Sequence, residues 1–231
     1  MPNFSQRSTE EEIMDNFSLP KEEIDPVLKE LETINKLLGG FSVFYDAFDK
    51  INIRIGDSIC DWGCGGGDSL KVLDSYFRKK GLKLNFIGVD ATAAAVDYAN
   101  NANKNYPNLK FRLANVLTEP FKENEFDVVI SSLFTHHFDD DAWVELVKKM
   151  IAASKTAVVI NDLHRHPLAY HSIGWLTQLF SKSAMVKHDS KLSVLRSFKR
   201  TELAYLLQKV GAKDYTIKWM WAFRWQIIIY K

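Results

Sequence analysis

Cysteine is scarce in this chain of 231 residues, where only Cys60 and Cys64 occur. Two cysteines exclude a disulfide framework and favour a reducing compartment, and we interpret both as small buried residues rather than nucleophiles. The chain also lacks any apolar run near the ~18 residues that a membrane span requires. Its first twenty residues are acidic where a secretory signal would be apolar, so the sequence predicts a cytoplasmic protein.

Positive and negative residues are nearly equal in number. The chain has 30 Lys and Arg residues and 29 Asp and Glu residues, which give a formal net charge of +1. No overall field would therefore gather nucleic acid or an anionic membrane, and no nucleic-acid partner is expected. An apolar fraction of 46% over this length is enough for one large domain with a real core. There is no internal repeat and no low-complexity tract.

Residues 1–50 read as a helical N-terminal extension that could cover a site as a lid. Apolar residues recur there at helical spacing until Gly39 and Gly40, namely Ile24, Leu28, Leu31, Ile34 and Leu38. Pro26 predicts that this helix starts near Asp25. The following aromatic stretch, "FSVFYDAFDKI", is expected to pack in the core, with a role as a lid over a ligand as the alternative.

From residue 51 to 231 the sequence predicts one α/β domain. Short apolar runs alternate with longer helical patterns, as in parallel strands joined by crossover helices. The expected strands are "SICDW", "LNFIGVD", "LKFRLAN", "FDVVISSLF", "TAVVIND", "DYTIKWM" and "FRWQIIIY". Before the last two strands we expect a helix over 201–210, capped by Thr201 and stopped by Gly211.

A glycine-rich stretch, "DWGCGGGD", follows the first expected strand. In an open parallel sheet this is where glycines let the backbone approach a ligand. A dinucleotide site requires Gly-x-Gly-x-x-Gly, but Asp68 or Leu70 stands at the third glycine in the two registers of this loop. The loop instead has an acidic residue, Asp61, followed by alternating Gly63, Gly65 and Gly67, and three such glycines exceed what a tight turn alone requires.

This loop resembles motif I of the class I S-adenosylmethionine-dependent methyltransferases. "FIGVDAT", "FRLANVLTEPF", "FDVVISSLFTHHFDD" and "FKRTELAYLLQKVGAK" resemble later segments of that family in the same order. The resemblance covers roughly residues 57–230 and is strongest to the small-molecule branch that includes the ubiquinone and menaquinone biosynthesis methyltransferases. It implies a Rossmann-like, seven-stranded, mostly parallel sheet with helices on both faces and an antiparallel last strand.

The resemblance also implies S-adenosylmethionine as the cofactor and a role for each matching residue. Asp61 and the three loop glycines would hold the methionine part, Asp90 with Ala91 the ribose, Asn115 and Val116 the adenine, and Ser132 and Leu133 would border the transferred methyl. Asn115 stands where the family usually has Asp, but an amide can still bond to adenine. Two simpler roles remain open, since Asp90 would also suit a helix cap and Asp61 would suit bracing of loop amides.

Methyl transfer from a sulfonium is an in-line displacement that depends mainly on positioning, so a base is required only for some acceptors. His136, after the fourth expected strand, and His164 and His166, after the fifth, are the candidate catalytic residues, with a structural role as the alternative. In the stretch after the fifth expected strand, the spacing of Asp162, His164 and His166 matches no strong metal motif, so no metal is expected.

Residues 167–197 exceed the length of a plain crossover and form an insertion. Packing of this insertion on the sheet is the default expectation, and the alternative is a substrate lid with an apolar underside and cations at its rim. The sequence therefore predicts methyl transfer to a small, apolar or aromatic acceptor. The alternatives are a protein or RNA methyltransferase and a noncatalytic S-adenosylmethionine-binding module, and the oligomeric state is open.

Overall fold

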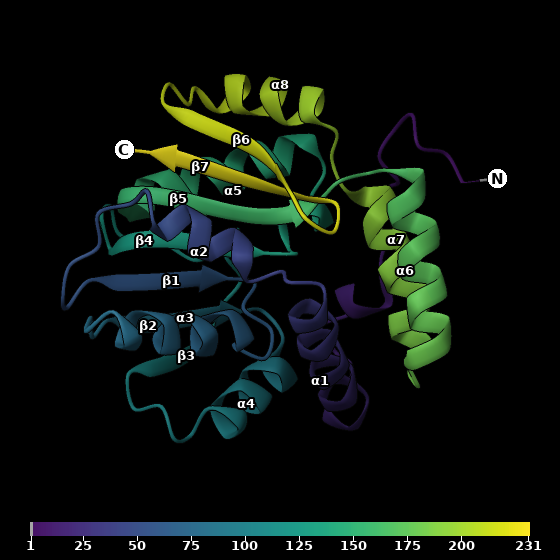
Figure 1. The fold of residues 1–231 in the computed structure, drawn as a ribbon, viewed down its shortest axis with the longest axis horizontal. Helices are drawn as coiled ribbons and strands as arrows, with labels where there is room; N and C mark the ends of the chain where they lie inside the picture. Colours follow the sequence, from purple (N-terminus) through teal and green to yellow (C-terminus); the bar gives the residue numbers. More distant parts are fainter. Residues whose placement is uncertain (1) are drawn as a thin grey trace.

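Seven strands form a single sheet in the computed structural model, which describes residues 2–231 (Figure 1). The strand order is β3-β2-β1-β4-β5-β7-β6. The strands are β1 (Ser58–Trp62), β2 (Asn85–Asp90), β3 (Leu109–Leu113), β4 (Phe126–Ser132), β5 (Ser154–Leu163), β6 (Tyr215–Met220) and β7 (Arg224–Tyr230). The predicted Rossmann-like sheet, mostly parallel with an antiparallel last strand, is confirmed, because β7 runs antiparallel to both β5 and β6.

The order in which the chain adds strands to the sheet changes direction between β1 and β4. The strands β1, β2 and β3 proceed toward one edge, whereas β4 and β5 proceed toward the other. The carboxyl ends of these five parallel strands lie at the same edge of the sheet (Figure 1). Ligands of such sheets bind at this switch point, so the topology places a site beyond β1 and β4.

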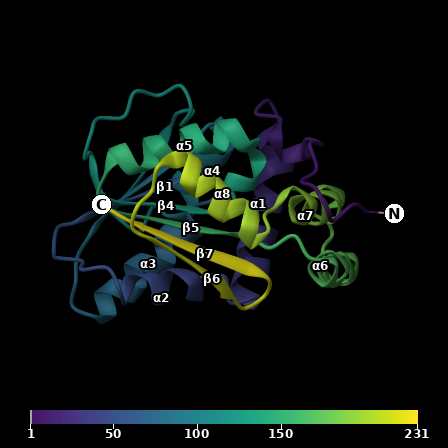
Figure 2. The same ribbon diagram turned by 90° about the horizontal axis from the view of Figure 1, so that it is seen from above.

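Helices cover both faces of the sheet (Figure 2). On one face lie α2 (Ser42–Phe48) and α3 (Asp68–Lys79), and on the other lie α5 (Asp140–Ala153) and α8 (Arg200–Val210). Each buries an apolar stripe, as Leu70, Leu73 and Phe77 of α3 do at helical spacing. Phe44 and Phe48 of α2 are buried in the same core, which confirms core packing for that aromatic stretch.

The remaining helices lie beyond the carboxyl edge of the sheet or beside β3. They are η1 (Ile13–Asp15), α1 (Lys21–Leu37), α4 (Ala93–Ala102), η2 (Thr135–His137), α6 (Pro167–Phe180) and α7 (Ala184–Arg196). The α6–α7 pair stands off the end of the sheet (Figures 1 and 2). The expectation that the insertion packs on the sheet is wrong, because α2, α3, α5 and α8 already cover its faces and α7 contacts η1, α1 and η2 instead.

Two expected helix starts also differ from the structure. The helix α1 begins at Lys21 after Pro20, so Pro26 lies inside it and lacks the N–H that would donate one turn back. The helix α8 begins at Arg200, and its N-cap is Lys199, whose backbone N–H donates to Glu202 Oε2 at 2.7 Å. Thr201 is therefore a helical residue rather than the cap.

Among the helices of residues 2–231, none combines the length and the apolar character needed to cross a membrane.

Candidate active site

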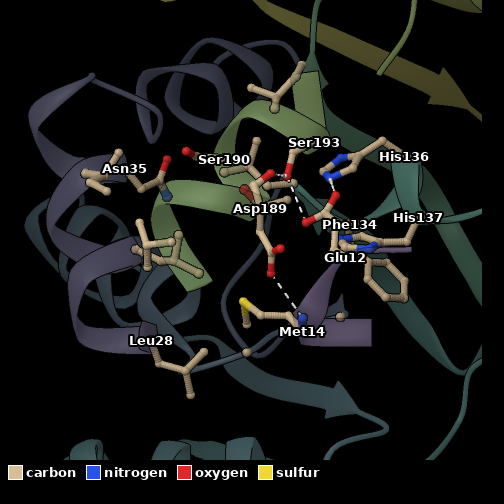
Figure 3. Close-up of a pocket in the computed structure, with 18 of the residues that line it drawn as sticks. Glu12, Met14, Leu28, Asn35, Phe134, His136, His137, Asp189, Ser190 and Ser193 are labelled. Atoms are coloured by element: carbon tan, nitrogen blue, oxygen red, sulfur yellow. Dashed lines mark hydrogen bonds and ion pairs between the residues drawn. The ribbon is translucent and has the colours of Figure 1, made fainter. Parts of the chain in front are cut away.

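A cavity of about 820 Å³ lies at the carboxyl edge of the sheet. The glycine loop after β1 and the ends of β2 and β4 form one side. The N-terminal segment, α1, α6, α7 and the turn between β6 and β7 form the others, and Figure 3 shows side chains from several of these elements facing one another. Most of the lining side chains are apolar, as in sites that hold small organic molecules.

The backbone of the glycine loop has a conformation and surroundings that leave little room for a side chain. Gly63 and Gly65 adopt φ of 73° and 48°, in the left-handed region that favours glycine. A Cβ on Gly63 would lie 2.2 Å from the Phe134 ring. The backbone can therefore approach the cavity at a place where a side chain at position 63 would strike the loop that follows β4.

Asp90 at the end of β2 holds the glycine loop in place. Its Oδ2 accepts from the Gly65 N–H at 2.9 Å, and its Oδ1 accepts from the Thr92 N–H at 2.9 Å. Thr92 rather than Asp90 is the N-cap of α4, so the simple helix-cap interpretation of Asp90 is wrong. The sequence left open that Asp61 accepts hydrogen bonds from backbone amides of the glycine loop. In the structure Asp90 accepts such a bond, from Gly65.

Asp61, Asp68 and Asp90 form an acidic group at this end of the cavity. Asp61 is 1% exposed, and its Oδ1 has no hydrogen-bond partner among the described residues. Burial raises the pKa of Asp61 well above its usual range, and the negative charges of Asp68 and Asp90 add to that rise. Burial likewise raises the pKa of Asp68 and of Asp90. A positively charged ligand would relieve all three carboxyl groups.

Arg224 is a buried cation on the cavity wall beside this acidic group. Its Nη2 donates to Asn35 Oδ1 at 3.0 Å, and Asn35 Nδ2 donates to Asp68 Oδ2 at 3.3 Å. Within residues 2–231 no carboxylate lies within ion-pair distance of Arg224, and its Nε is buried without a partner. Burial lowers the pKa of Arg224 to about 10, against the attraction of Asp162 and Asp68. The guanidinium thus has a free donor for an anionic group.

The end of β4 presents strained backbone to the cavity. Leu133 has φ of 53°, which is rare for a residue with a branched side chain. Its N–H donates to the Asn161 carbonyl at 2.8 Å, and the Asn161 side chain donates to Ser132 Oγ at 3.0 Å. The neighbouring β5 thus holds Ser132 and Leu133 in position on the cavity wall.

His136 lies buried at the opposite end of the cavity. Its Nδ1 contacts Asp162 Oδ1 at 2.6 Å, and its Nε2 lies 3.5 Å from Glu12 Oε1. Burial would lower the pKa of His136, but the carboxylates of Asp162 and Glu12 outweigh it and raise this pKa to about 9. The same pairing holds the pKa of Asp162 and of Glu12 below their usual ranges despite burial.

The N-terminal segment, residues 8–18, is held against this end of the cavity. Asp15 Oδ1 contacts His137 Nδ1 at 2.6 Å, and Asp15 Oδ2 accepts from Arg196 Nη1 at 2.6 Å. Asp189 of α7 accepts from the N–H groups of Ile13 and Met14 at 3.0 and 3.1 Å, the second of which is drawn in Figure 3. Although burial opposes it, the bond to His137 lowers the pKa of Asp15.

The structure brings many of the predicted site residues to this cavity but not all. Asp61, Gly63, Gly65, Asp90, Ser132, Leu133 and His136 line it, whereas Gly67, Ala91, Asn115, Val116, His164 and His166 do not. Asn115 is exposed and accepts from the Leu117 N–H at 2.9 Å, while Val116 is buried in the core.

The two histidines after β5 lie elsewhere. His166 caps α6, because its Nδ1 accepts from the Leu168 N–H at 3.1 Å. His164 is half-buried beside Trp225, and burial lowers its pKa. The position of these two side chains outside the cavity gives no support to their interpretation as catalytic residues.

Several lining residues carried no sequence signal. Glu12 and Asp15 lie in an acidic stretch without a motif, and Trp221 and Arg224 lie in and beside an ordinary β-hairpin turn. The presence of tryptophans flanking this turn was a weak hint, because exposed aromatic residues often mark binding surfaces. Trp221 is 72% exposed.

The site fits a nucleoside cofactor with a positively charged amino-acid part. The unpartnered Asp61 carboxylate and the free Arg224 donor suit an ammonium and a carboxylate, and the glycine loop admits close approach. Asp90, at the end of the second parallel strand, stands where such sheets bind a ribose. The fold and this loop are those of Rossmann-like α/β proteins, which bind a ligand at the carboxyl edge of the sheet.

Comparisons with known proteins specify this class further. Residues 59–157 match the family described as "Methyltransferase domain". A phosphoethanolamine N-methyltransferase of Triticum aestivum is 28% identical over 104 residues, which are 44% of this chain and 20% of the relative. An uncharacterized methyltransferase of Bacillus subtilis is 25% identical over 152 residues, 64% of this chain and 57% of the relative. The chain thus spans from a fifth to little more than half of these two relatives.

Solved structures share the fold across nearly the whole chain. An S-adenosylmethionine-dependent methyltransferase of Aquifex aeolicus matches with a TM-score of 0.64 at 13% identity, covering 92% of this chain and 99% of its own. The magnesium protoporphyrin IX methyltransferase of Synechocystis, solved with S-adenosylhomocysteine, matches with a TM-score of 0.53 at 13% identity, covering 91% and 86%. The chain thus has the fold of these S-adenosylmethionine-dependent methyltransferases, and its residues 59–157 match a methyltransferase domain.

Proposed function

We propose that the protein transfers the methyl group of S-adenosylmethionine to a small, apolar or aromatic acceptor by in-line displacement. The observation that carries this proposal is the continuous cavity of about 820 Å³ between the glycine loop and His136. Small-molecule sites have volumes of about 300–1,000 Å³, so this cavity is in the range for a cofactor together with a small acceptor. Leu133, Phe134, Phe138 and Trp221 on its wall suit an apolar or aromatic acceptor.

The cofactor supplies a methyl group that is already activated by a positively charged sulfur. In the proposed arrangement Asp61 accepts from the ammonium of the methionine part, and Arg224 Nε donates to its carboxylate. Gly63, Gly65 and Gly67 admit the methionine chain, and Asp90 with Ala91 would bind the ribose. Asn115 and Val116 lie outside the cavity, so the adenine contact that the sequence predicts for them has no support in its lining.

The chain's own contribution to the chemistry is then mainly positioning and exclusion of water. Ser132 and Leu133, fixed by Asn161, would border the methyl group. Two reactants aligned in a dry site need little further catalysis for a displacement. His136, charged between Asp162 and Glu12, is a hydrogen-bond donor rather than a base in this state, so the proposal gives proton abstraction to none of the three candidate histidines.

The residue assignments are tested most directly at Asp90. Replacing Asp90 by Ala removes the acceptor of the Gly65 and Thr92 N–H groups and the proposed ribose contact. We expect S-adenosylhomocysteine to bind about 30- to 100-fold more weakly, since hydrogen bonds to a charged group contribute about 1.5–3 kcal/mol. Calorimetric titration measures this, with Asp97→Ala on the exposed side of α4 as control. An unchanged affinity would remove Asp90 from the ribose role.

The acceptor class is tested with methyl-labelled S-adenosylmethionine and three fractions of a cell extract: small metabolites, protein and RNA. We expect label in the metabolite fraction, in compounds that partition into an organic solvent. Label confined to protein or RNA would overturn the small-molecule proposal. Binding of S-adenosylhomocysteine without label in any fraction would instead indicate a noncatalytic binding module.

A further inference from the structure

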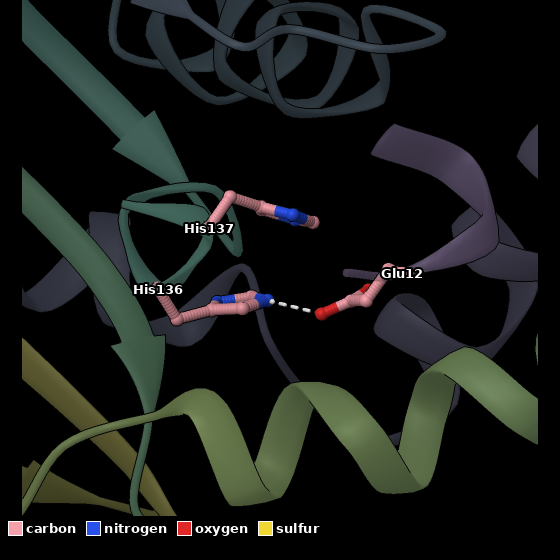
Figure 4. A group of neighbouring side chains, drawn as sticks. All are labelled: Glu12, His136 and His137. Atoms are coloured by element: carbon pink, nitrogen blue, oxygen red, sulfur yellow. Dashed lines mark ion pairs between the residues drawn. The ribbon is translucent and has the colours of Figure 1, made fainter. Parts of the chain in front are cut away.

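Glu12, His136 and His137 gather at the end of the cavity opposite the glycine loop (Figure 4). Glu12 comes from the N-terminal segment, and the two histidines come from η2 after β4. One ligand-type atom of each lies within 4.8 Å of those of the other two. The rings of His136 and His137 are stacked, with their centroids 4.4 Å apart, so both imidazoles present their edges in the same direction.

Both imidazoles are oriented by a carboxylate. Asp162 Oδ1 lies 2.6 Å from Nδ1 of His136, and Asp15 Oδ1 lies 2.6 Å from Nδ1 of His137. A carboxylate on Nδ1 fixes the ring and leaves Nε2 as the ligand atom, which is the usual environment of a metal-binding histidine. One histidine–carboxylate pair would be enough to stabilise the buried His136. The second pair, His137 with Asp15, orients another imidazole beside it.

The atoms that face one another are also unsatisfied. His136 Nε2 and Glu12 Oε1 are both buried without a hydrogen-bond partner in the part of the chain that the structure describes. The other carboxylate oxygen of Glu12, Oε2, accepts from Ser193 Oγ at 2.8 Å, so Oε1 alone remains for a ligand.

The separation of these two atoms suits an ion better than a direct bond. Nε2 and Oε1 lie 3.5 Å apart, whereas an N–H···O hydrogen bond spans about 2.7–3.2 Å. Two ligands at about 2.1 Å from one tetrahedral ion lie about 3.4 Å from each other. A metal ion would take the place of a proton on Nε2.

We propose that Glu12, His136 and His137 bind one divalent transition-metal ion of the zinc type. Two imidazole nitrogens and one carboxylate oxygen are a ligand set that Zn²⁺ accepts, whereas Mg²⁺ prefers oxygen ligands. All three residues line the cavity, so the ion would lie at its wall. The ion joins residue 12 to residues 136 and 137, and it thereby fixes the N-terminal segment on the loop after β4.

The first test is metal binding by the full chain after treatment with a chelator. We expect calorimetric titration to show one Zn²⁺ per chain, Co²⁺ to give the visible absorption of a four-coordinate site, and Mg²⁺ to give no signal at the same concentration. Glu12→Gln and His137→Gln should each weaken Zn²⁺ binding at least tenfold. The matched controls Glu10→Gln, next to Glu12 but exposed, and His171→Gln, exposed on α6, should bind as the unchanged protein does.

The second test follows the N-terminal segment and does not depend on methyl transfer. Zn²⁺ should slow proteolysis within residues 8–18 of the unchanged chain, and Glu12→Gln should remove this protection. Circular dichroism verifies that each variant keeps its secondary structure. Absence of Zn²⁺ binding, or equal binding by the Glu12 and His137 variants and the controls, would overturn the proposal.

Discussion

The two ends of the cavity hold carboxylates in opposite electrostatic states. At the glycine-loop end, burial raises the pKa of Asp61, Asp68 and Asp90. At the N-terminal end, the pKa values of Glu12, Asp15 and Asp162 are lowered although burial opposes this. The difference is the presence of partners, since His136, His137 and Arg196 pair with the second group.

A group of buried carboxylates without an ion-pair partner is costly unless a ligand completes it, and Arg224 reaches Asp68 only through Asn35. The glycine-loop end is therefore organised for a cation that the chain does not contain, which agrees with a cofactor that carries a sulfonium and an ammonium. At the N-terminal end the chain itself supplies the groups that pair with Glu12, Asp15 and Asp162. Binding of the cofactor should accordingly depend on the first end and be nearly independent of the second.

The largest expected effect is at Gly63. In Gly63→Ala, the new Cβ would lie 2.2 Å from the Phe134 ring, on a backbone with φ of 73°. We expect a loss of about 2–4 kcal/mol in the free energy of unfolding and loss of detectable S-adenosylhomocysteine binding. The measurements are denaturant unfolding and calorimetric titration.

Gly81→Ala is the matched control, because Gly81 has φ of 75° but no atom within 4 Å of a new Cβ. It carries the backbone strain without the clash, so we expect about 1 kcal/mol of destabilisation and unchanged binding. Equal behaviour of the two variants would show that space at the loop does not decide binding.

Arg224→Met should give the next largest effect, because it removes the free guanidinium donor. We expect S-adenosylhomocysteine to bind about tenfold more weakly, in line with one charged hydrogen bond. Methylthioadenosine lacks the amino-acid part, so its affinity should not change. A parallel loss for both ligands would show that Arg224 supports the fold of the cavity instead of contacting the methionine carboxylate.

The pH dependence of binding is a smaller effect of known sign. The pKa values of Asp61, Asp68 and Asp90 are raised above 3.8, so their contribution to stability is present below about pH 4 and is lost as the pH rises through the raised values. A cationic ligand lowers these values and releases protons. S-adenosylmethionine should therefore bind more tightly as the pH rises from 5 to 8.

This pH dependence is measured by titration calorimetry in buffers of different ionisation enthalpy. S-adenosylhomocysteine lacks the sulfonium charge, and its affinity should rise less steeply over the same range. Binding that weakens with pH would contradict the assignment of the acidic group to the cofactor.

The smallest expected effect is at the opposite end. Asp15→Asn weakens the contacts to His137 and Arg196, so the melting temperature should fall. Affinity for S-adenosylhomocysteine should stay within about twofold of the unchanged protein. A loss as large as that of Arg224→Met would show that the two ends of the cavity are coupled.

The glycine-loop end could be predicted from the sequence because its determinants are local. Gly63, Gly65, Asp61 of β1 and Asp90 at the end of β2 lie within thirty positions of one another, in or next to strands with clear apolar runs. The strands were predicted nearly to the residue for the same reason. The start of α1 was not, because Pro26 is tolerated inside a helix that tertiary contacts stabilise.

The N-terminal end could not be predicted, because its contacts join distant parts of the chain. Asp189 binds the backbone of Ile13, and Asp15 binds Arg196, across more than 170 positions in both cases. No periodicity or motif encodes such pairs. Even His136, which was a candidate, acquires its partners Glu12 and Asp162 only through the fold.

The way in which Asp189 holds Ile13 and Met14 has a practical consequence for protein engineering. Residues 2–16 contribute no strand to the sheet and no residue to its two main core clusters. A shortened chain that begins at residue 17 would lose one wall of the cavity and would leave Asp189 and Arg196 without these partners. Trimming or tagging this terminus should therefore open the cavity and lower the stability of the chain.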